Sequence, residues 1–162
     1  MADIESIHKQ RKIMVGVDES EESMNALSWA LDFFCIGNAK DSLILLHAQP
    51  PPGDYSNMDS TGYLFSSEID QAVEKYQKNV TENVLKRAKS ICIGKNVCEE
   101  SRVCVGDARD VICEEAEKIK PDFLVIGSHG YGTIKRAFLG SVSDYCAHNV
   151  KCPVLIVKHL KK

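Results

Sequence analysis

Short apolar runs alternate with amphipathic helical patterns along this chain, and this order constrains the fold more than any other feature. Segments 13–17, 43–46 and 123–126 are continuous apolar runs, as is typical of strands buried on both faces of a sheet. Segment 101–105 alternates instead, which indicates an edge strand, and 153–157 completes a set of five. Strands that alternate with helices predict a single α/β domain, with a parallel sheet and helices on both faces.

Four helical patterns separate the strands. The first follows Ser20, a suitable N-cap, and places Glu21 and Glu22 in its first turn, where they oppose the positive end of the helix dipole. Apolar residues then recur every three or four positions near 27–34, 69–91 and 108–119, and a fourth helix is expected over 141–148. Segment 50–67 is rich in proline, glycine and serine, which predicts a mobile surface loop. We expect a tail over 1–11 and one domain over 12–160.

Composition excludes several classes of protein. The 162 residues carry a net charge of −3 with both signs mixed, so no basic face for nucleic acid or a membrane surface is expected. No apolar run approaches the roughly 18 residues of a membrane helix, and the charged first residues predict no signal peptide. Seven cysteines without a CxxC pair are typical of reduced thiols in the core. A cytoplasmic location is therefore expected, with nuclear access left open, and no metal held by the protein.

The strongest chemical signal lies in the glycine-rich segment 127–143. Gly127 and Gly130 follow a buried strand, and Gly140 precedes the last helix together with Ser141 and Ser143. Glycines allow close backbone approach, and a helix N-terminus offers free N–H donors and positive potential, which together suit a phosphate. The alternative interpretation is that the glycines serve turns and that Ser141 is an ordinary N-cap. The segment matches neither the GxGxxG nor the GK[ST] pattern.

This segment resembles the nucleotide-binding branch of the universal stress protein family, and in particular its plant members. The branch carries G-x2-G-x9-G-[ST], which Gly127, Gly130, Gly140 and Ser141 match at the required spacing. Segments 15–18, 45–48, 106–107 and 152–157 resemble further family motifs in the same order. The resemblance implies a Rossmann-like sheet with strand order 3-2-1-4-5, similar to the adenine nucleotide alpha hydrolases. The order then reverses between the first and fourth strands, where open α/β sheets bind ligands.

The resemblance also implies a ligand, ATP or AMP, and a set of contacts. It places Asp18 by the ribose, the main chain of Ala48 by the adenine, and the last helix at the phosphates, with Mg²⁺ as a possible bridge between them. The predicted nucleotide-binding residues are Gly16, Val17, Asp18, Ala48, Gly127, Gly130, Gly140, Ser141, Val142 and Ser143. It further implies a homodimer through the last strand, which begins at Pro153 and ends at Val157 and offers Val154 and Ile156 beside an unpaired edge.

Three functions fit these features. The first is a nucleotide-dependent dimeric switch in the stress response, because no residue is recognisable as a base that activates water. The second is a slow Mg²⁺-dependent ATPase or phosphotransferase, and the third is a holdase-like or redox-responsive protein. Among single residues, Asp107 is interpreted as a helix cap, His47 as structural and His129 as facing solvent, although His129 and Tyr131 lie close enough to the glycines to meet a phosphate. No catalytic residue is assigned.

Overall fold

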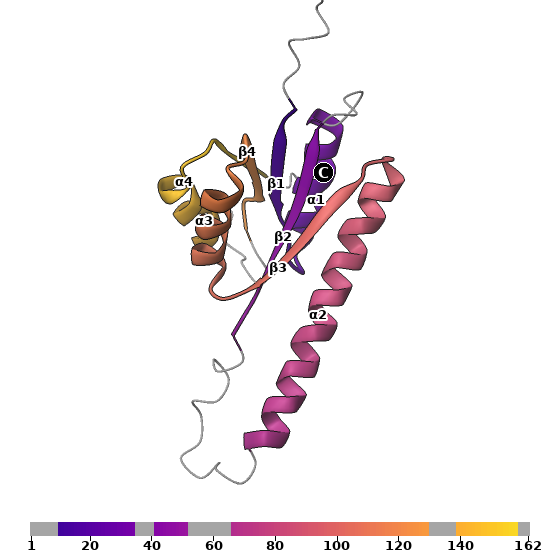
Figure 1. The fold of residues 1–162 in the computed structure, drawn as a ribbon, viewed down its shortest axis with the longest axis vertical. Helices are drawn as coiled ribbons and strands as arrows, with labels where there is room; N and C mark the ends of the chain where they lie inside the picture. Colours follow the sequence, from indigo (N-terminus) through magenta and orange to yellow (C-terminus); the bar gives the residue numbers. More distant parts are fainter. Residues whose placement is uncertain (1–9, 35–40, 52–65, 130–138, 159–162) are drawn as a thin grey trace, which may run out of the picture.

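The computed structural model describes residues 10–34, 41–51, 66–129 and 139–158, which form a five-stranded parallel sheet between two layers of helices (Figure 1). In chain order the elements are β1 (Lys12–Gly16), α1 (Glu21–Phe34), β2 (Ser42–Gln49), α2 (Ser66–Gly94), β3 (Glu99–Val105), α3 (Ala108–Ile119), β4 (Phe123–Gly127), α4 (Ser141–Asn149) and β5 (Val154–Val157). Within the described residues, no helix is both long and apolar enough to cross a membrane.

The sheet has the order β3-β2-β1-β4-β5, as predicted, and every neighbouring pair is parallel. β1 lies at the centre, paired with β2 on one side and with β4 on the other. β3 and β5 form the two edges, so the alternating pattern of 101–105 did indicate an edge strand. The order reverses between β1 and β4, which places the carboxyl ends of these two strands on either side of the switch point.

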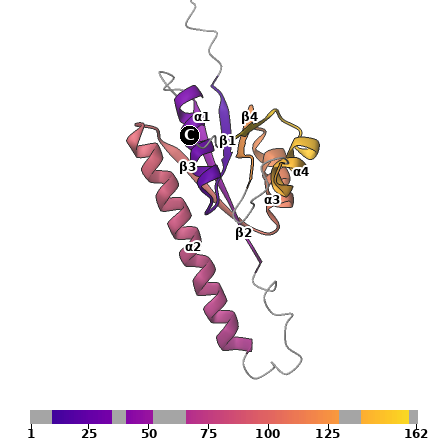
Figure 2. The same cartoon turned by 180° about the vertical axis from the view of Figure 1, so that it is seen from behind.

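Two separate cores lie on the two faces of the sheet, because side chains alternate along each strand. Ile13 and Val15 of β1 pack with α1 and α2, whereas Met14 between them packs with α3 and α4. Figures 1 and 2 show α2 on one side of the sheet and α3 with α4 on the other. Strands with apolar residues at every position therefore bury both faces, as the continuous runs predict.

Helix α2 differs from its predicted packing, because only its second part is buried. The apolar pattern of 69–91 continues throughout the helix, yet Ile69 is 53% and Tyr76 is 61% exposed. Burial begins at Gln77 and continues through Val84 and Ala88. A helix of 29 residues is about 44 Å long, whereas the eight residues of β2 span about 27 Å. The first part of α2 consequently extends past the sheet (Figures 1 and 2).

The segment 50–67 is only partly described. α2 begins at Ser66, so the last two residues of the expected loop are helical, and residues 52–65 lie outside the described residues. Among the cysteines, Cys92 and Cys146 are buried in the two cores, whereas Cys98 is exposed. The six described cysteines form no disulfide with one another.

Candidate functional site

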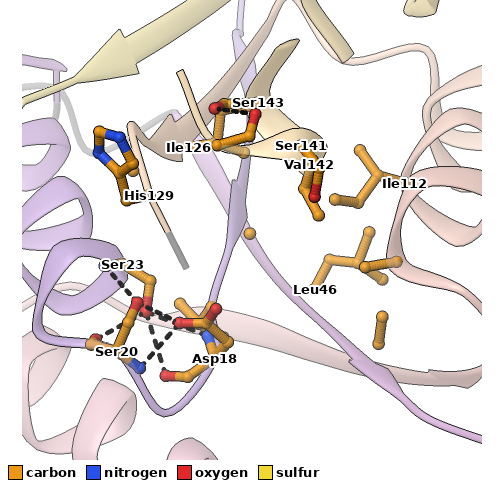
Figure 3. A pocket seen from close by; sticks show the side chains of 16 residues that line it. Asp18, Ser20, Ser23, Leu46, Ile112, Ile126, His129, Ser141, Val142 and Ser143 are labelled. Carbon is orange, nitrogen blue, oxygen red and sulfur yellow. Dashed lines mark hydrogen bonds between the residues drawn. The ribbon is translucent and has the colours of Figure 1, made fainter. Parts of the chain in front are cut away.

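A cavity of about 290 Å³ opens at the carboxyl ends of β1 and β4, where the strand order reverses. This volume is at the lower end of the range of about 300–1,000 Å³ that is usual for small-molecule sites. Figure 3 shows the labelled side chains around the cavity, with Leu46 and Ile112 together on one side and Asp18, Ser20 and Ser23 clustered on another. The described lining consists of Gly16, Val17, Asp18, Ser20, Ser23, Leu46, Ala48, Ala108, Ile112, Ile126, Gly127, His129, Gly140, Ser141, Val142 and Ser143.

The turn after β1 forms a hydrogen-bonded cluster on one wall. The Asp18 carboxylate accepts the Ser20 N–H at 2.9 Å and also the Ser20 hydroxyl. The Ser20 Oγ accepts the Ser23 N–H at 3.1 Å, so Ser20 is the N-cap of α1, as predicted. The Asp18 N–H in turn donates to the Ser23 Oγ at 3.0 Å. The start of α1 is therefore satisfied by its own side chains, and Asp18 holds the turn while also lining the cavity.

The start of α4 forms the opposite wall and has no such cap. Gly140, not Ser141, occupies the N-cap position, and it offers no side chain to the helix. The first intrahelical bond runs from the Asp144 N–H to the Gly140 oxygen at 2.9 Å. The N–H groups of Ser141, Val142 and Ser143 come before that bond, and all three residues line the cavity. Within the described residues, the cavity thus faces three helix N–H groups that no side chain caps.

The hydroxyl of Ser143 is hydrogen-bonded to main-chain carbonyl groups of the protein. It lies 2.8 Å from the Ser128 oxygen and 3.0 Å from the Gly140 oxygen, both of which can only accept. The single hydroxyl hydrogen is directed at these carbonyls, so it is not available to a ligand in the cavity. The glycine-rich segment suggested hydroxyl donors at Ser141 and Ser143, and for Ser143 this prediction is wrong. Ser141 has an exposed side chain and no recorded partner among the described residues.

Two glycines of the motif are required by packing against the protein itself. A Cβ on Gly127 would lie 2.9 Å from the Glu22 carbonyl carbon and 3.0 Å from its oxygen. A Cβ on Gly140 would lie 3.1 Å from the Ser128 oxygen, the same oxygen that accepts the Gly140 N–H at 2.8 Å. Gly127 therefore brings β4 against the start of α1, and Gly140 brings α4 against the end of β4. Both contacts shape the cavity, which the two glycines also line.

The cavity has one apolar end and one polar end. Leu46 and Ile112 belong to the core between the sheet and α3 and form the apolar end (Figure 3), while Ile126, Ala48 and Ala108 add further apolar lining. The polar end lies between the Asp18 turn and the start of α4. Asp18 is the only acidic residue of the described lining, which contains no lysine or arginine. Such a cavity suits a molecule that has a flat apolar part and an anionic part held by main-chain N–H groups.

The structure also gives the positions and hydrogen bonds of His47, Asp107 and His129, which do not belong to the predicted binding set. His47 is buried and donates its Nδ1–H to the Val17 oxygen at 2.9 Å, so it is structural, as predicted. Asp107 caps α3 by accepting the Arg109 N–H at 2.9 Å, and hydrogen bonds from Arg109 lower the pKa of this carboxyl. His129 does not face solvent freely, because it is half-buried, lines the cavity and lies 3.1 Å from the Ser128 Oγ.

The structure brings together nine of the ten predicted binding residues around this cavity; Gly130 lies outside the described residues, as do Tyr131, Lys135 and Arg136. Sequence reasoning missed the apolar end. Ala108 and Ile112 belong to the first turns of α3, and only the sheet topology carries them to the same edge. Leu46 could have been predicted from the sequence, because it lies two residues before Ala48 and therefore on the same face of β2.

No group of three or more His, Cys, Asp or Glu in the described part of the chain is placed to hold a metal ion.

Comparison with known proteins identifies the family. The model of the universal stress protein family matches residues 9–158, nearly the whole chain. The chain belongs to the universal stress protein family. The universal stress protein A-like protein of Arabidopsis thaliana is 30% identical over 158 residues, covering 91% of this chain and 89% of its own.

Solved structures of family members share the fold. A family protein of Arabidopsis thaliana, solved with AMP bound, has a TM-score of 0.66 and 25% identity, covering 93% of this chain and 92% of its own. A universal stress protein in complex with cAMP has a TM-score of 0.65 and 27% identity, covering 93% and 98%. Both ligands carry an adenine, a ribose and one phosphate group.

Proposed function

We propose that this universal stress protein binds an adenine nucleotide, AMP or ATP, in the cavity between β1, β4 and α4. The observation that carries the proposal is the uncapped start of α4, where three N–H groups face the cavity. Helix N-termini of this kind stabilise phosphate through N–H donors and the helix dipole. The AMP and cAMP complexes of the two similar proteins support the choice of an adenine nucleotide.

The two ends of the cavity suggest how the nucleotide is oriented. The adenine packs among Leu46, Ile112 and Ile126, beside the main chain of Ala48. The phosphate lies at Ser141–Ser143, away from the Asp18 carboxylate that would repel it. The ribose then lies between them, where the Asp18 carboxylate can accept a ribose hydroxyl as a charge-assisted hydrogen bond. Only one carboxylate of the described lining reaches the cavity, so Mg²⁺ would be held mainly by ATP phosphates and water.

We favour a binding protein over the two alternative functions. An ATPase needs a group that positions the attacking water, yet Asp18 is the only carboxylate of the described lining, and the arrangement proposed above places it at the ribose rather than at the phosphate. A redox sensor needs an accessible thiolate. Burial raises the pKa of Cys104, Cys113 and Cys152, and it raises the pKa of Cys146 to about 12. These four thiols stay protonated at neutral pH, and Cys98 is the one exposed thiol among the described cysteines. Occupancy of the cavity, rather than turnover or oxidation, is then the signal that a dimeric switch would transmit.

Two substitutions at Ser141 test the proposal. Proline is well tolerated as the first residue of a helix, and Gly140 already has the extended backbone that a residue before proline needs, with φ −62° and ψ 158°. Ser141→Pro therefore removes one N–H donor while keeping α4, whereas Ser141→Ala removes the hydroxyl and keeps the N–H. We expect Ser141→Pro to weaken AMP binding at least tenfold in isothermal titration calorimetry, as the loss of a hydrogen bond to a charged group implies.

The alanine variant is the matched control for the main-chain donor. It should bind AMP within a few-fold of the unmodified protein, and both variants should unfold at similar urea concentrations. If Ser141→Pro folds normally and binds AMP unchanged, the start of α4 is not the phosphate site. If the unmodified protein itself binds neither AMP nor ATP, the proposed function is wrong.

A further inference from the structure

A second cavity, of about 160 Å³, lies between the end of β2, the turn after β1 and α2. Asp18 and Ala48 border both cavities, so the second lies directly beside the first. It opens on the α1 and α2 side of the sheet, at the point where α2 leaves the sheet and extends past it. The nucleotide proposed above lies in the first cavity and meets the border of the second only at Asp18 and Ala48.

The side chain of Gln77 is the unusual feature of this cavity. It is only 4% exposed, and neither its Nε2 nor its Oε1 has a hydrogen-bond partner among the described residues. A buried amide without partners lowers stability, because it loses its hydrogen bonds to water on folding. Buried polar groups in proteins are nearly always paired, so Gln77 needs a partner that the described residues do not supply. It lines the cavity and offers a donor beside an acceptor.

Two neighbouring polar side chains of this cavity hold fixed arrangements. One turn along α2, the Thr81 hydroxyl donates to the Gln49 Oε1 at 3.0 Å. The buried His47 is fixed by its bond to the Val17 oxygen. The amide of Gln77 differs from both, because it is buried in the same lining and has no hydrogen-bond partner among the described residues.

Charge and shape restrict what can enter. Asp18 and Glu19 border the cavity, and no lysine or arginine does so among the described residues. An anion would be repelled there, because nothing in this lining compensates its charge. Tyr76 borders the opening and is largely exposed, so it offers the face of an aromatic ring, while Val80 and Pro50 add apolar surface. A volume of 160 Å³ also exceeds the roughly 30 Å³ of a single water about fivefold.

We infer that this second cavity is a binding site for an uncharged, planar small molecule whose edge carries a hydrogen-bond donor beside an acceptor, such as an aromatic carboxamide or a free nucleobase. Gln77 pairs with that edge through both atoms of its amide, in the way that glutamine pairs with the edge of adenine in nucleic acids. The ring packs against Tyr76 and Val80. The site does not depend on nucleotide binding in the first cavity.

A pair of probes with the same ring tests the inference. Nicotinamide carries the required carboxamide, and nicotinate carries a carboxylate in its place. We expect nicotinamide to shift the side-chain amide signals of Gln77 saturably in ¹H–¹⁵N NMR spectra at neutral pH, and nicotinate to bind at least tenfold more weakly. Gln77→Leu should weaken nicotinamide binding about tenfold, whereas Gln71→Leu, at an exposed position of the same helix, should leave it unchanged.

Gln77→Leu should also change the stability of the protein, which urea unfolding measures. Since an unpaired buried amide costs stability, Gln77→Leu is expected to unfold at a higher urea concentration than the unmodified protein. Gln77→Glu keeps the length of the side chain, replaces its donor with a negative charge, and should also lose nicotinamide, so it serves if the leucine variant fails to fold. Equal binding of the two probes, no saturable shift, or full affinity in both Gln77 variants would overturn the inference and leave a water-filled cavity. AMP binding is measured separately, so neither result decides the other.

Discussion

Gly127 shows that a glycine of the motif can be required by its packing against the rest of the protein. The end of β4 lies so close to the start of α1 that a Cβ on Gly127 would sit 2.9 Å from the Glu22 carbonyl carbon. The contact is with main-chain atoms, which cannot turn aside as a flexible side chain could. Gly127 thereby fixes the distance between β4 and α1, the helix that follows the Asp18 turn.

We predict that Gly127→Ala destabilises the protein. Relief of the clash requires a backbone shift at the end of β4, and overpacking of this kind costs about 1–3 kcal/mol. Urea unfolding followed by circular dichroism measures the change. Gly94→Ala is the control, because a Cβ there meets nothing within 4 Å and the change should be neutral or slightly stabilising. Equal stability of the two variants would mean that the close approach of β4 and α1 is not a constraint.

Between elements, Glu115 ties α3 to the edge strand β3. Its side chain is largely buried and accepts from Lys118 at 2.9 Å and from Arg102 of β3 at 3.3 Å. The hydrogen bond from Lys118, helped by Arg102, holds the pKa of the Glu115 carboxyl below its ordinary value of 4.5. A carboxyl whose pKa is lowered on folding stabilises the protein above that ordinary value and loses the contribution as the pH falls through the folded-state pKa.

We therefore predict a pH-dependent effect of Glu115→Gln. Near pH 7 the variant should be less stable by about 1 kcal/mol, since both cationic partners lose their carboxylate. The difference should shrink below pH 4.5 and vanish once Glu115 is protonated in the folded protein. Urea midpoints across this pH range measure it, with the exposed Glu114→Gln as control. A difference that stays constant with pH would show that the effect of the substitution is packing rather than charge.

The strands were predictable from the sequence, and the burial of the helices was less so. Strands 13–17 and 123–126 are shifted or extended by a single residue in the structure, because a continuous apolar run leaves few alternatives. The apolar pattern of α2 gave no sign that its first part would extend past the sheet, since periodicity does not report the length of the surface available. The polar end of the cavity followed from the glycine motif. The apolar end did not, because α3 reaches it only through the sheet topology.

At the scale of the whole molecule, β5 is an open edge. The Pro153 carbonyl accepts from Leu124 of β4 at 2.9 Å, and the Val157 carbonyl accepts from Ser128, directly after β4, at 3.1 Å. Because residues alternate along a strand, the N–H groups of Val154 and Ile156 point away from β4. An apolar edge of this kind is a template for pairing with another chain, and we propose that two copies of the protein pair there.

We predict that light scattering gives a mass twice the 18.0 kDa of one chain. Ile156→Pro removes an outward N–H and should give a folded monomer, because proline is tolerated on an edge strand when its missing N–H faces away from the sheet. Leu155→Pro removes an inward N–H instead and should destabilise the fold. A monomeric unmodified protein, or a dimer that survives Ile156→Pro, would place the interface elsewhere.

Binding of an adenine nucleotide at the start of α4 can be observed by an NMR titration with AMP. We expect saturable shifts in the main-chain amide signals of Ser141, Val142 and Ser143, with one AMP bound per chain and little change along β3. If AMP and ATP leave these three signals unmoved at millimolar concentration, or if the shifts gather elsewhere, the nucleotide does not bind at the start of α4.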